Sequence, residues 1–296
     1  MDILVLAGGN NSRMKTDLPK FFLKLADKPI IRHIIDNYKL FHNCNIHVVT
    51  ATKYASSELF SDVNSILQPI ANGTAGAVTV ALAHLTSDTV IVQYSDVPLI
   101  SVATIKQLIE CDADAVVTVA SLPEEQISKP YGRVFHDNGI FERIIEYKEL
   151  NDEQKLCNTF NVGLYKFKTE LLKAMLPEVK VHKGMTELFL PDVLQIFKAH
   201  NKTVKVIYDD DYEECVGMNN MSELVQAESI LQKRIIEKFI QNGVQILSPN
   251  TTYISAETQI GRNVIIEPNV VIKGKSVIAD NVTVKSFSYI NNEVIK

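Results

Sequence analysis

The carboxyl-terminal part of the chain carries an aliphatic residue at every sixth position. The repeated positions are Ile254, Ile260, Ile266, Ile272, Ile278, Val284 and Ile290, and Val264, Val270 and Val282 precede three of them by two residues. Neither a helix nor an alternating strand has a six-residue period, whereas each face of a left-handed parallel β-helix takes six residues and points one aliphatic side chain inward. The repeat therefore predicts a short left-handed parallel β-helix over residues 243–296, of about two coils.

The first two thirds of the chain alternate short apolar runs with helical patterns. The runs at 3–6, 46–50, 89–94 and 115–120 are typical of buried strands, and the segments 29–40, 74–85 and 102–110 are typical of helices. Strands that alternate with helices favour a mostly parallel sheet covered on both faces. In such sheets ligands bind beyond the carboxyl ends of the strands. We predict an α/β domain over residues 1–220.

An amphipathic segment separates this domain from the repeat. Apolar residues follow helical spacing over 221–241, and Asn242-Gly243 is a typical helix end. We predict a linker helix over 221–242, so that the chain has three parts, 1–220, 221–242 and 243–296.

The composition fits a reduced, aqueous compartment. Lys+Arg 30 and Asp+Glu 35 give a formal net charge of −5, which disfavours a general nucleic-acid binder. The four cysteines show no metal-ligand spacing. The amino terminus lacks the regions of a secretory signal, and no stretch reaches the ~20 apolar residues that span a bilayer. We predict a cytoplasmic protein with no nucleic-acid or membrane partner.

The first predicted strand ends in a glycine-containing loop that is followed by two cations. Gly8 and Gly9 come directly after the strand, Arg13 lies in the loop, and Lys20 follows Pro19. Small residues let backbone N–H groups approach phosphates, and the two cations neutralise them. This pattern predicts a triphosphate site, and an ordinary turn with surface charges is the alternative.

Two oxygen-donor side chains are candidate ligands of a divalent cation. Asp96 follows the predicted strand 89–94, and Asn219 precedes the predicted linker helix. A carboxylate and an amide oxygen suit Mg²⁺ when water and phosphate fill the remaining positions. The alternative is that Asp96 and Asn219 cap the helices that follow them.

Further polar residues suit a base and a sugar. Gln68 offers the paired donor and acceptor that reads a pyrimidine edge, and the turn Gly73-Thr74 offers backbone donors at a helix start. Gly132, Glu146 and Asn161 together suit a sugar phosphate, because the glycine permits close approach and the carboxylate accepts hydroxyl groups. Each of these residues also has a purely structural explanation.

Taken in order, these segments resemble one enzyme family. Residues 6–14 with Pro19-Lys20 are similar to the opening of sugar-1-phosphate nucleotidyltransferases. The hexapeptide tail and five further segments narrow the resemblance to one family within this group. The segments are Tyr94-Ser95-Asp96-Val97-Pro98-Leu99, Tyr131-Gly132-Arg133, Glu146-Tyr147-Lys148, Asn161-Val162-Gly163 and Gly217-Met218-Asn219-Asn220. The whole chain resembles the bacterial bifunctional N-acetylglucosamine-1-phosphate uridylyltransferase/glucosamine-1-phosphate N-acetyltransferase family, truncated to the uridylyltransferase half plus a β-helix stub.

The resemblance implies a Rossmann-like nucleotidyltransferase domain with a mixed, mostly parallel sheet. The implied reaction joins UTP to N-acetylglucosamine 1-phosphate and releases pyrophosphate, with Mg²⁺ as cofactor. Arg13 and Lys20 would then neutralise the triphosphate, and Asp96 and Asn219 would ligate Mg²⁺. The implied substrate-binding residues are Leu6, Ala7, Gly8, Gly9, Gln68, Gly73 and Thr74 for the uridine part, Tyr94, Gly132, Glu146 and Asn161 for the sugar, and Asn219.

The chain departs from the family pattern at several of these positions. Asn11-Ser12 stands where the family usually has Gly-Thr, Ala75-Gly76 stands for Gly-His, and Val162 stands for a threonine. We expect a less tightly held sugar rather than a lost reaction. The residues for acetyl transfer are absent, so we expect that activity to be absent, either in a natural one-activity protein or in a piece of a longer one.

Two other functions remain open on the sequence alone. One is another nucleotidyltransferase, which would act on a different sugar phosphate or on methylerythritol phosphate. The other is a non-catalytic remnant that binds UDP-sugars. Hexapeptide β-helices commonly trimerise, so monomer and homotrimer are both open.

Overall fold

The computed structural model describes residues 1–9, 12–182 and 184–296, without the side chains of Ser12 and Thr52. These residues form two compact units. The first contains Met1–Ser12 and Ile34–Gly217, and the second contains Arg13–His33 and Met218–Lys296. The division into 1–220, 221–242 and 243–296 stays a prediction, and the contacts add that Arg13–His33 group with the carboxyl-terminal part of the chain.

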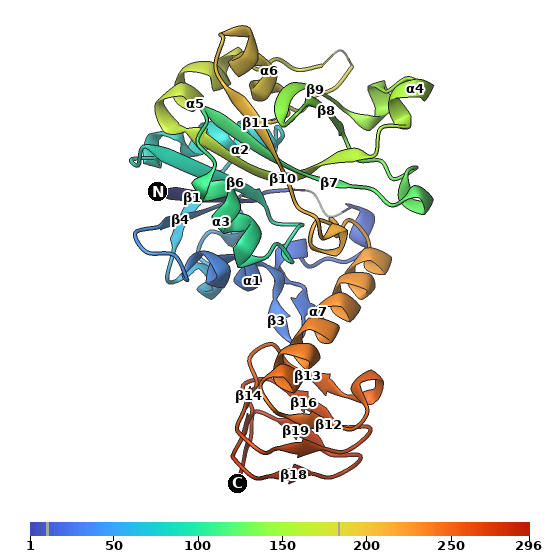
Figure 1. Ribbon diagram of the computed structural model, residues 1–296. Coiled ribbons are helices and arrows are strands. Elements are labelled where there is room, and N and C mark those ends of the chain that lie inside the picture. The colour runs from blue at the N-terminus through green and yellow to red at the C-terminus, as the bar shows by residue number, and fades with distance from the viewer. Residues whose placement is uncertain (10–11, 183) are drawn as a thin grey trace. The chain divides into compact units, whose positions relative to one another are not determined.

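The first unit is built on a mixed sheet (Figure 1). Its strands among the described residues, in spatial order, are β5 (Asn64–Gln68), β4 (Asn45–Ala51), β1 (Asp2–Ala7), β6 (Thr89–Tyr94), β10 (Thr159–Lys168), β7 (Ala115–Ser121), β11 (Val204–Tyr208), β9 (Ile140–Ile145) and β8 (Arg133–Asp137). The first four are parallel, β10 is antiparallel to both β6 and β7, and β11 is parallel to β7. β8 and β9 form an antiparallel hairpin. The predicted α/β fold with a mixed sheet is confirmed.

Helices cover both faces of this sheet. α2 (Thr74–Ala81), α5 (Thr169–Met175) and α6 (Asp192–Ala199) pack on one face against the aliphatic and aromatic core. α3 (Val102–Glu110) lies on the other face, because Lys166 of β10 donates hydrogen bonds to the carbonyl oxygens of Ile109 and Cys111 at its end. The residues on either side of Lys166 point into the opposite core, as the alternation of a strand requires.

The remaining elements differ little from their predicted positions. The predicted helix 29–40 is α1 (Ile30–Tyr38), and the predicted helix 74–85 ends at Ala81 and continues as a 3₁₀ turn, because the amide of Leu85 bonds to the carbonyl of Leu82. α4 (Asp152–Lys155) is short. The 3₁₀ turns are Ser12–Met14, Lys20–Phe22, Thr52–Tyr54, Glu58–Phe60, Leu82–His84, Glu124–Gln126, Tyr147–Glu149, Leu176–Glu178, Tyr212–Glu214 and Pro249–Thr251.

The second unit contains the long helix and the repeat. α7 (Met221–Gln241) has the predicted bounds, and Asn220 caps it by accepting a hydrogen bond from the amide of Glu223 at 3.0 Å. No helix among the described residues is both long and apolar enough to cross a membrane.

A parallel β-helix follows α7, as the six-residue period predicted. Its three faces are the sheets β12 (Gln245–Ile246), β15 (Ile265–Ile266), β18 (Thr283–Val284); β13 (Tyr253–Ile254), β16 (Val271–Lys273), β19 (Tyr289–Asn291); and β14 (Gln259–Ile260), β17 (Val277–Ile278), β20 (Val294–Ile295). The repeated aliphatic residues are buried inside, except for the partly buried Ile260. Each face has three strands rather than the expected two. The strands β13, β16 and β19 all lie in the six-residue register, whereas the other two faces gain their third strand from β12 and β20, which pair outside that register.

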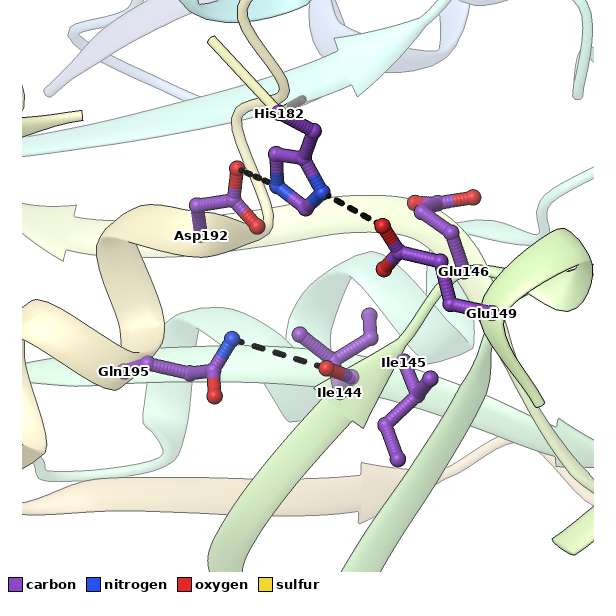
Figure 2. A pocket seen from close by; sticks show the side chains of 7 residues that line it. All are labelled: Ile144, Ile145, Glu146, Glu149, His182, Asp192 and Gln195. Carbon is purple, nitrogen blue, oxygen red and sulfur yellow. Dashed lines mark hydrogen bonds and ion pairs between the residues drawn. The ribbon is translucent and has the colours of Figure 1, made fainter. Parts of the chain in front are cut away.

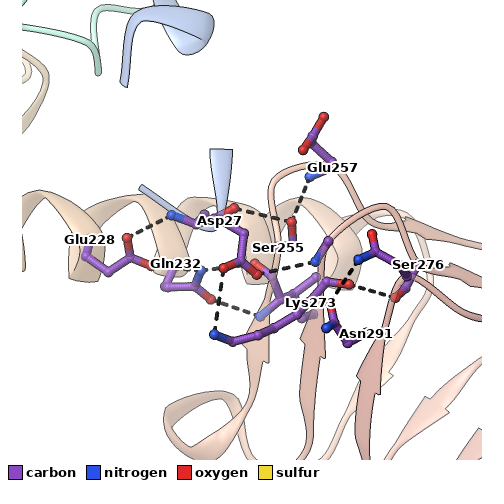
Figure 3. Close-up of polar contacts among 12 residues, drawn as sticks. Asp27, Glu228, Gln232, Ser255, Glu257, Lys273, Ser276 and Asn291 are labelled. Carbon is purple, nitrogen blue, oxygen red and sulfur yellow. Dashed lines mark hydrogen bonds and ion pairs between the residues drawn. The ribbon is translucent and has the colours of Figure 1, made fainter. Parts of the chain in front are cut away.

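A small hairpin ties the segment Arg13–His33 to the β-helix and to α7 within this unit (Figure 3). It consists of β2 (Lys24–Leu25) and β3 (Lys28–Pro29), with Ala26 and Asp27 at its tip in the left-handed region. The Ala26 amide donates to the carboxylate of Glu228 on α7 at 2.8 Å, and its carbonyl accepts from the Ala256 amide at 2.9 Å. These contacts fix the segment that carries both Arg13 and Lys20.

Candidate active site

The predicted uridine residues of the first unit lie where neighbouring parallel strands end. β1 ends at Ala7, next to Gly8, and β5 ends at Gln68. The amide nitrogen of Gln68 donates to Asn72 Oδ1 at 3.2 Å and to the Gly73 carbonyl at 3.3 Å. These two bonds use both amide hydrogens and turn Oε1 toward Gly8, where an added Cβ would overlap it. Gln68 therefore presents an acceptor above the first loop glycine.

The turn at the start of α2 is held by the chain segment around Leu188. Gly73 has φ of 98°, and a Cβ there would overlap the Leu188 backbone, so the position requires glycine. Thr74 Oγ1 accepts from the Leu190 amide at 2.9 Å, and the Ala75 amide donates to the Leu188 carbonyl at 3.0 Å. The amino end of α2 is thereby fixed beside Gln68, and its role as a base-binding turn stays a prediction.

The four predicted sugar residues are brought together in the same unit. The backbone N–H of Asn161 on β10 donates to the Gly132 carbonyl at 3.0 Å, and Glu146 Oε1 lies within contact distance of the space beside Gly132. The Tyr165 hydroxyl lies 2.7 Å from Asn161 Nδ2 and 3.4 Å from the Tyr94 hydroxyl. Residues from four different strands or strand ends thus converge on one place.

The turn Val162-Gly163 explains how Tyr94 is placed. Gly163 has φ of 88° at a break in the β10–β7 register, and a Cβ there would overlap the Tyr94 ring. Val162, which stands where the family usually has a threonine, is buried at 4% exposure. Burial at this position favours an apolar side chain, because a buried hydroxyl needs a hydrogen-bond partner.

A polar pocket of about 210 Å³ opens beside Glu146 (Figure 2). Its lining residues are Ile144, Ile145, Glu146, Glu149, His182, Asp192 and Gln195. His182 lies between two carboxylates, with Nδ1 2.9 Å from Glu149 Oε1 and Nε2 2.8 Å from Asp192 Oδ2. Sequence reasoning found Glu146 but missed the other polar residues, since they come from three separate segments without a common motif.

The carboxylate of Glu146 differs from those of Glu149 and Asp192 in its hydrogen bonding. None of the hydrogen bonds among the described residues reaches it, so both oxygens are available to a ligand. Burial raises the pKa of Glu146, and the carboxylates of Asp192 and Glu149 raise it further, whereas His182 lowers it. The hydrogen bonds that His182 donates to Glu149 and Asp192 raise the pKa of His182 to about 9.

The predicted phosphate residues belong to the second unit. Arg13 is exposed and donates from Nη2 to Asn219 Oδ1 at 3.0 Å. Asn219 is not the cap of α7, because Asn220 has that role. The backbone N–H of Asn219 donates to Glu223 Oε2 at 2.6 Å. Its side-chain oxygen is thus directed to Arg13, and Lys20 lies in the same unit at the turn Lys20–Phe22. Asn10 and Asn11 of the predicted phosphate loop lie outside the described residues, and Gly9 lies inside them.

The predicted metal ligands offer oxygen atoms of the kind that Mg²⁺ binds. Asp96 follows β6 and does not cap α3, because Ser101 accepts the hydrogen bond from the Thr104 amide. No group of three or more His, Cys, Asp or Glu residues with metal-binding geometry occurs in the described ranges. One carboxylate and one amide oxygen, completed by water and phosphate, nevertheless fit the ion. Asp96 belongs to the first unit and Asn219 to the second, so their pairing stays a prediction.

The fold and these residues define a nucleotide-transferring class of α/β protein. Residues 3–161 match the model of the MobA-like NTP transferase domain, and residues 257–292 match the bacterial transferase hexapeptide of six repeats. The chain belongs to the MobA-like NTP transferase family.

Its similarity to particular relatives extends over nearly the whole chain. It is 35% identical over 96% of its length to the bifunctional protein GlmU of Shouchella clausii and 34% identical over 99% to that of Staphylococcus haemolyticus. The chain spans about two thirds of these relatives, 64% and 66% of their lengths.

Solved structures share the fold. A CMP:2-keto-3-deoxy-manno-octonic acid synthetase complexed with CTP matches 78% of this chain and 98% of its own, with a TM-score of 0.61 and 13% identity. A UDP-glucose pyrophosphorylase complexed with UDP-glucose matches 79% of this chain and 98% of its own, with a TM-score of 0.60 and 18% identity. At such low identity these likenesses concern the fold alone.

Proposed function

We propose that this chain is a uridylyltransferase that joins UTP and N-acetylglucosamine 1-phosphate to give UDP-N-acetylglucosamine and pyrophosphate. The observation that carries the proposal is the convergence of Tyr94, Gly132, Glu146 and Asn161 on one place beside the nucleotide turn. Identity of 35% to a bifunctional GlmU protein over 96% of the chain supports the same substrates.

In the proposed reaction an oxygen of the sugar phosphate attacks the α-phosphorus of UTP in line. The bond between the α-phosphorus and the bridging oxygen breaks, and pyrophosphate leaves with the electron pair. No protein nucleophile is required, so positioning and charge neutralisation supply the catalysis.

The proposed roles follow the two units. Arg13 and Lys20 neutralise the triphosphate and the leaving pyrophosphate. Asp96 and Asn219 would hold Mg²⁺, which would supply further charge neutralisation for the phosphates. The uridine part is held by Leu6, Ala7, Gly8, Gly9, Gln68, Gly73 and Thr74, and the sugar by Tyr94, Gly132, Glu146 and Asn161.

Pyrophosphate release tests the proposal directly. The purified chain is incubated with N-acetylglucosamine 1-phosphate and UTP, CTP or dTTP, and then with other sugar phosphates and methylerythritol phosphate. The fastest release is expected for UTP with N-acetylglucosamine 1-phosphate. Another preferred pair would assign a different nucleotidyltransferase, and no release from any pair would favour a UDP-sugar-binding remnant. Light scattering on the same sample decides between monomer and homotrimer.

Asp96→Asn is expected to weaken the response to magnesium. The substitution keeps the shape but removes the charge of the proposed ligand, so the Mg²⁺ concentration for half-maximal rate should rise on the order of tenfold or more. Asp112→Asn, at an exposed aspartate of the same unit, is the control. An unchanged Mg²⁺ titration would remove Asp96 from the metal site.

Asn72→Ala is expected to reduce the preference for UTP over CTP. Without Asn72 Oδ1 the amide of Gln68 loses one of the two acceptors that fix its orientation, and Oε1 no longer consistently faces a uracil N3–H. The loss of one hydrogen bond predicts a roughly fivefold smaller ratio of kcat/KM values. Asn64→Ala, at the exposed start of β5, should leave the ratio unchanged.

A further inference from the structure

The pocket beside Glu146 contains a charge arrangement that the proposed reaction does not by itself explain. Three carboxylates line it, from Glu146, Glu149 and Asp192, and His182 is the one basic side chain among the lining residues. Carboxylates that share a partly buried site repel one another and favour protonation of one of them. The carboxylate of Glu146 is the one of the three that accepts no hydrogen bond among the described residues, so its protonation is favoured most by the neighbouring negative charges.

The geometry of His182 shows which charge it carries. Both ring nitrogens face carboxylate oxygens, at 2.9 Å to Glu149 and 2.8 Å to Asp192 (Figure 2). A neutral imidazole has one N–H, so only the imidazolium donates to both partners. The raised pKa of His182, about 9, agrees with a cation at neutral pH. Phe189 packs edge-on against the ring at 5.6 Å and helps to hold its orientation.

The groups that face Glu146 come from every element around the pocket. Glu149 lies in the 3₁₀ turn that follows Glu146, Asp192 lies in the first turn of α6, and His182 lies in the segment before α6. The phenols of Tyr94 and Tyr165, on β6 and β10, face it as neutral groups, since burial raises their pKa values. His182 is therefore the positive charge that opposes the two neighbouring carboxylates.

We propose that His182 is a positioning residue of the sugar pocket: bridging Glu149 and Asp192, its imidazolium keeps Glu146 an ionised carboxylate that accepts hydroxyl groups of the sugar phosphate. This inference rests on the proposed function, because it assigns the sugar to Glu146. It also explains the carboxylates of Glu149 and Asp192, since they hold the imidazolium in place and keep it protonated. The nucleotide turn at Gln68 contributes no group to this pocket.

The sign of the pH dependence follows from these charges. Loss of the His182 cation removes the one influence that lowers the pKa of Glu146, so this pKa rises further in the variant. At acidic pH more of Glu146 is then protonated in the variant, and fewer molecules offer a carboxylate to the sugar. As the pH rises Glu146 ionises in both proteins, so the difference between them shrinks.

His182→Gln tests the inference, with steady-state kinetics from pH 5.5 to 8.5. The expected result is a roughly tenfold higher KM for the sugar phosphate at pH 6.5, an acid limb that moves to higher pH, and a nearly unchanged KM for UTP. His200→Gln is the matched control, because His200 makes a similar pair with Glu178 at 3.0 Å on the exposed surface. It should change none of these values.

Glu149→Gln in the His182→Gln background separates charge from structure. This double variant lacks both the His182 cation and the Glu149 anion, so its pocket keeps two carboxylates and has the same net charge as that of the wild type. Recovery of the acid limb is expected. A similar rise in KM for both substrates in His182→Gln, with a lower Tm and no recovery in the double variant, would assign His182 a structural role and overturn the inference. Unchanged kinetics in His182→Gln would overturn it as well.

A carboxyl carbon-13 NMR titration of Glu146 tests the inference without a measurement of activity. The midpoint should lie at higher pH in His182→Gln than in the wild type. Equal midpoints would overturn the role of His182 even in an active enzyme. A wild type that releases no pyrophosphate with any substrate pair would instead overturn the proposed function, while the NMR comparison would still show whether His182 controls Glu146.

Discussion

Arg13→Ala is expected to lower kcat for pyrophosphate release by roughly 10²–10³-fold, as the removal of a preorganised electrostatic donor does in other enzymes. In-line attack on a triphosphate develops negative charge on the leaving pyrophosphate. The proposed reaction has no covalent enzyme intermediate, so catalysis depends on neutralising this charge. Arg13 is exposed, and its side chain is oriented by Asn219 Oδ1 at 3.0 Å.

The effect should appear in turnover rather than in folding. Arg13 has no buried contact whose loss would unfold the unit, so the Tm of the variant should stay within about 2 °C of the wild type. Arg262→Ala, at an exposed arginine of the β-helix, is the matched control and should keep full activity. A normal kcat in Arg13→Ala would show that another group neutralises the pyrophosphate.

The parts of the fold that repeat or alternate could be predicted from the sequence. The six-residue period fixed which side chains enter the β-helix, and Ile254, Ile266 and Ile272 are buried inside it. The predicted bounds of β6 and α3 agree with the structure to the residue. The run Val90-Ile91-Val92 is buried within β6, and Ile105 and Leu108 form the buried side of α3. The end of the predicted strand 89–94 then indicated where Tyr94 would lie, whereas the strand that ends at Gln68 was not predicted.

The parts that depend on tertiary contact could not be predicted in this way. His182 lies in an irregular segment, and no local sequence pattern links it to Glu149, which precedes it by 33 residues. Asn72 acts on Gln68 through one side-chain bond in a turn. The hairpin at Ala26 and Asp27 lies within the predicted domain 1–220, but its partners on α7 and the β-helix come more than 200 residues later.

Arg133 is a second residue whose role emerges only from the three-dimensional structure. The sequence places it next to the sugar residue Gly132, as part of Tyr131-Gly132-Arg133. The structure buries it completely, and its guanidinium donates to the carbonyl oxygens of Cys157, Tyr131, Ile127 and Lys129 at 2.8, 2.5, 2.6 and 3.2 Å. One side chain thus holds the loop before Gly132 and the start of β10 together.

Arg133→Met is therefore expected to destabilise the first unit by about 3–5 kcal/mol, because it leaves several buried carbonyl groups without a donor. The thermal transition of that unit should fall on the order of 10 °C. Arg143→Met is the control on the same hairpin, since Arg143 is exposed and lies over the Phe135 ring at 4.8 Å, a contact of about 1 kcal/mol or less. Equal transition temperatures for the two variants would show that the backbone around Gly132 is held by other contacts. If Arg133→Met unfolds early, its surviving folded fraction at low temperature should still show a raised KM for the sugar phosphate, because Gly132 loses the loop that positions it.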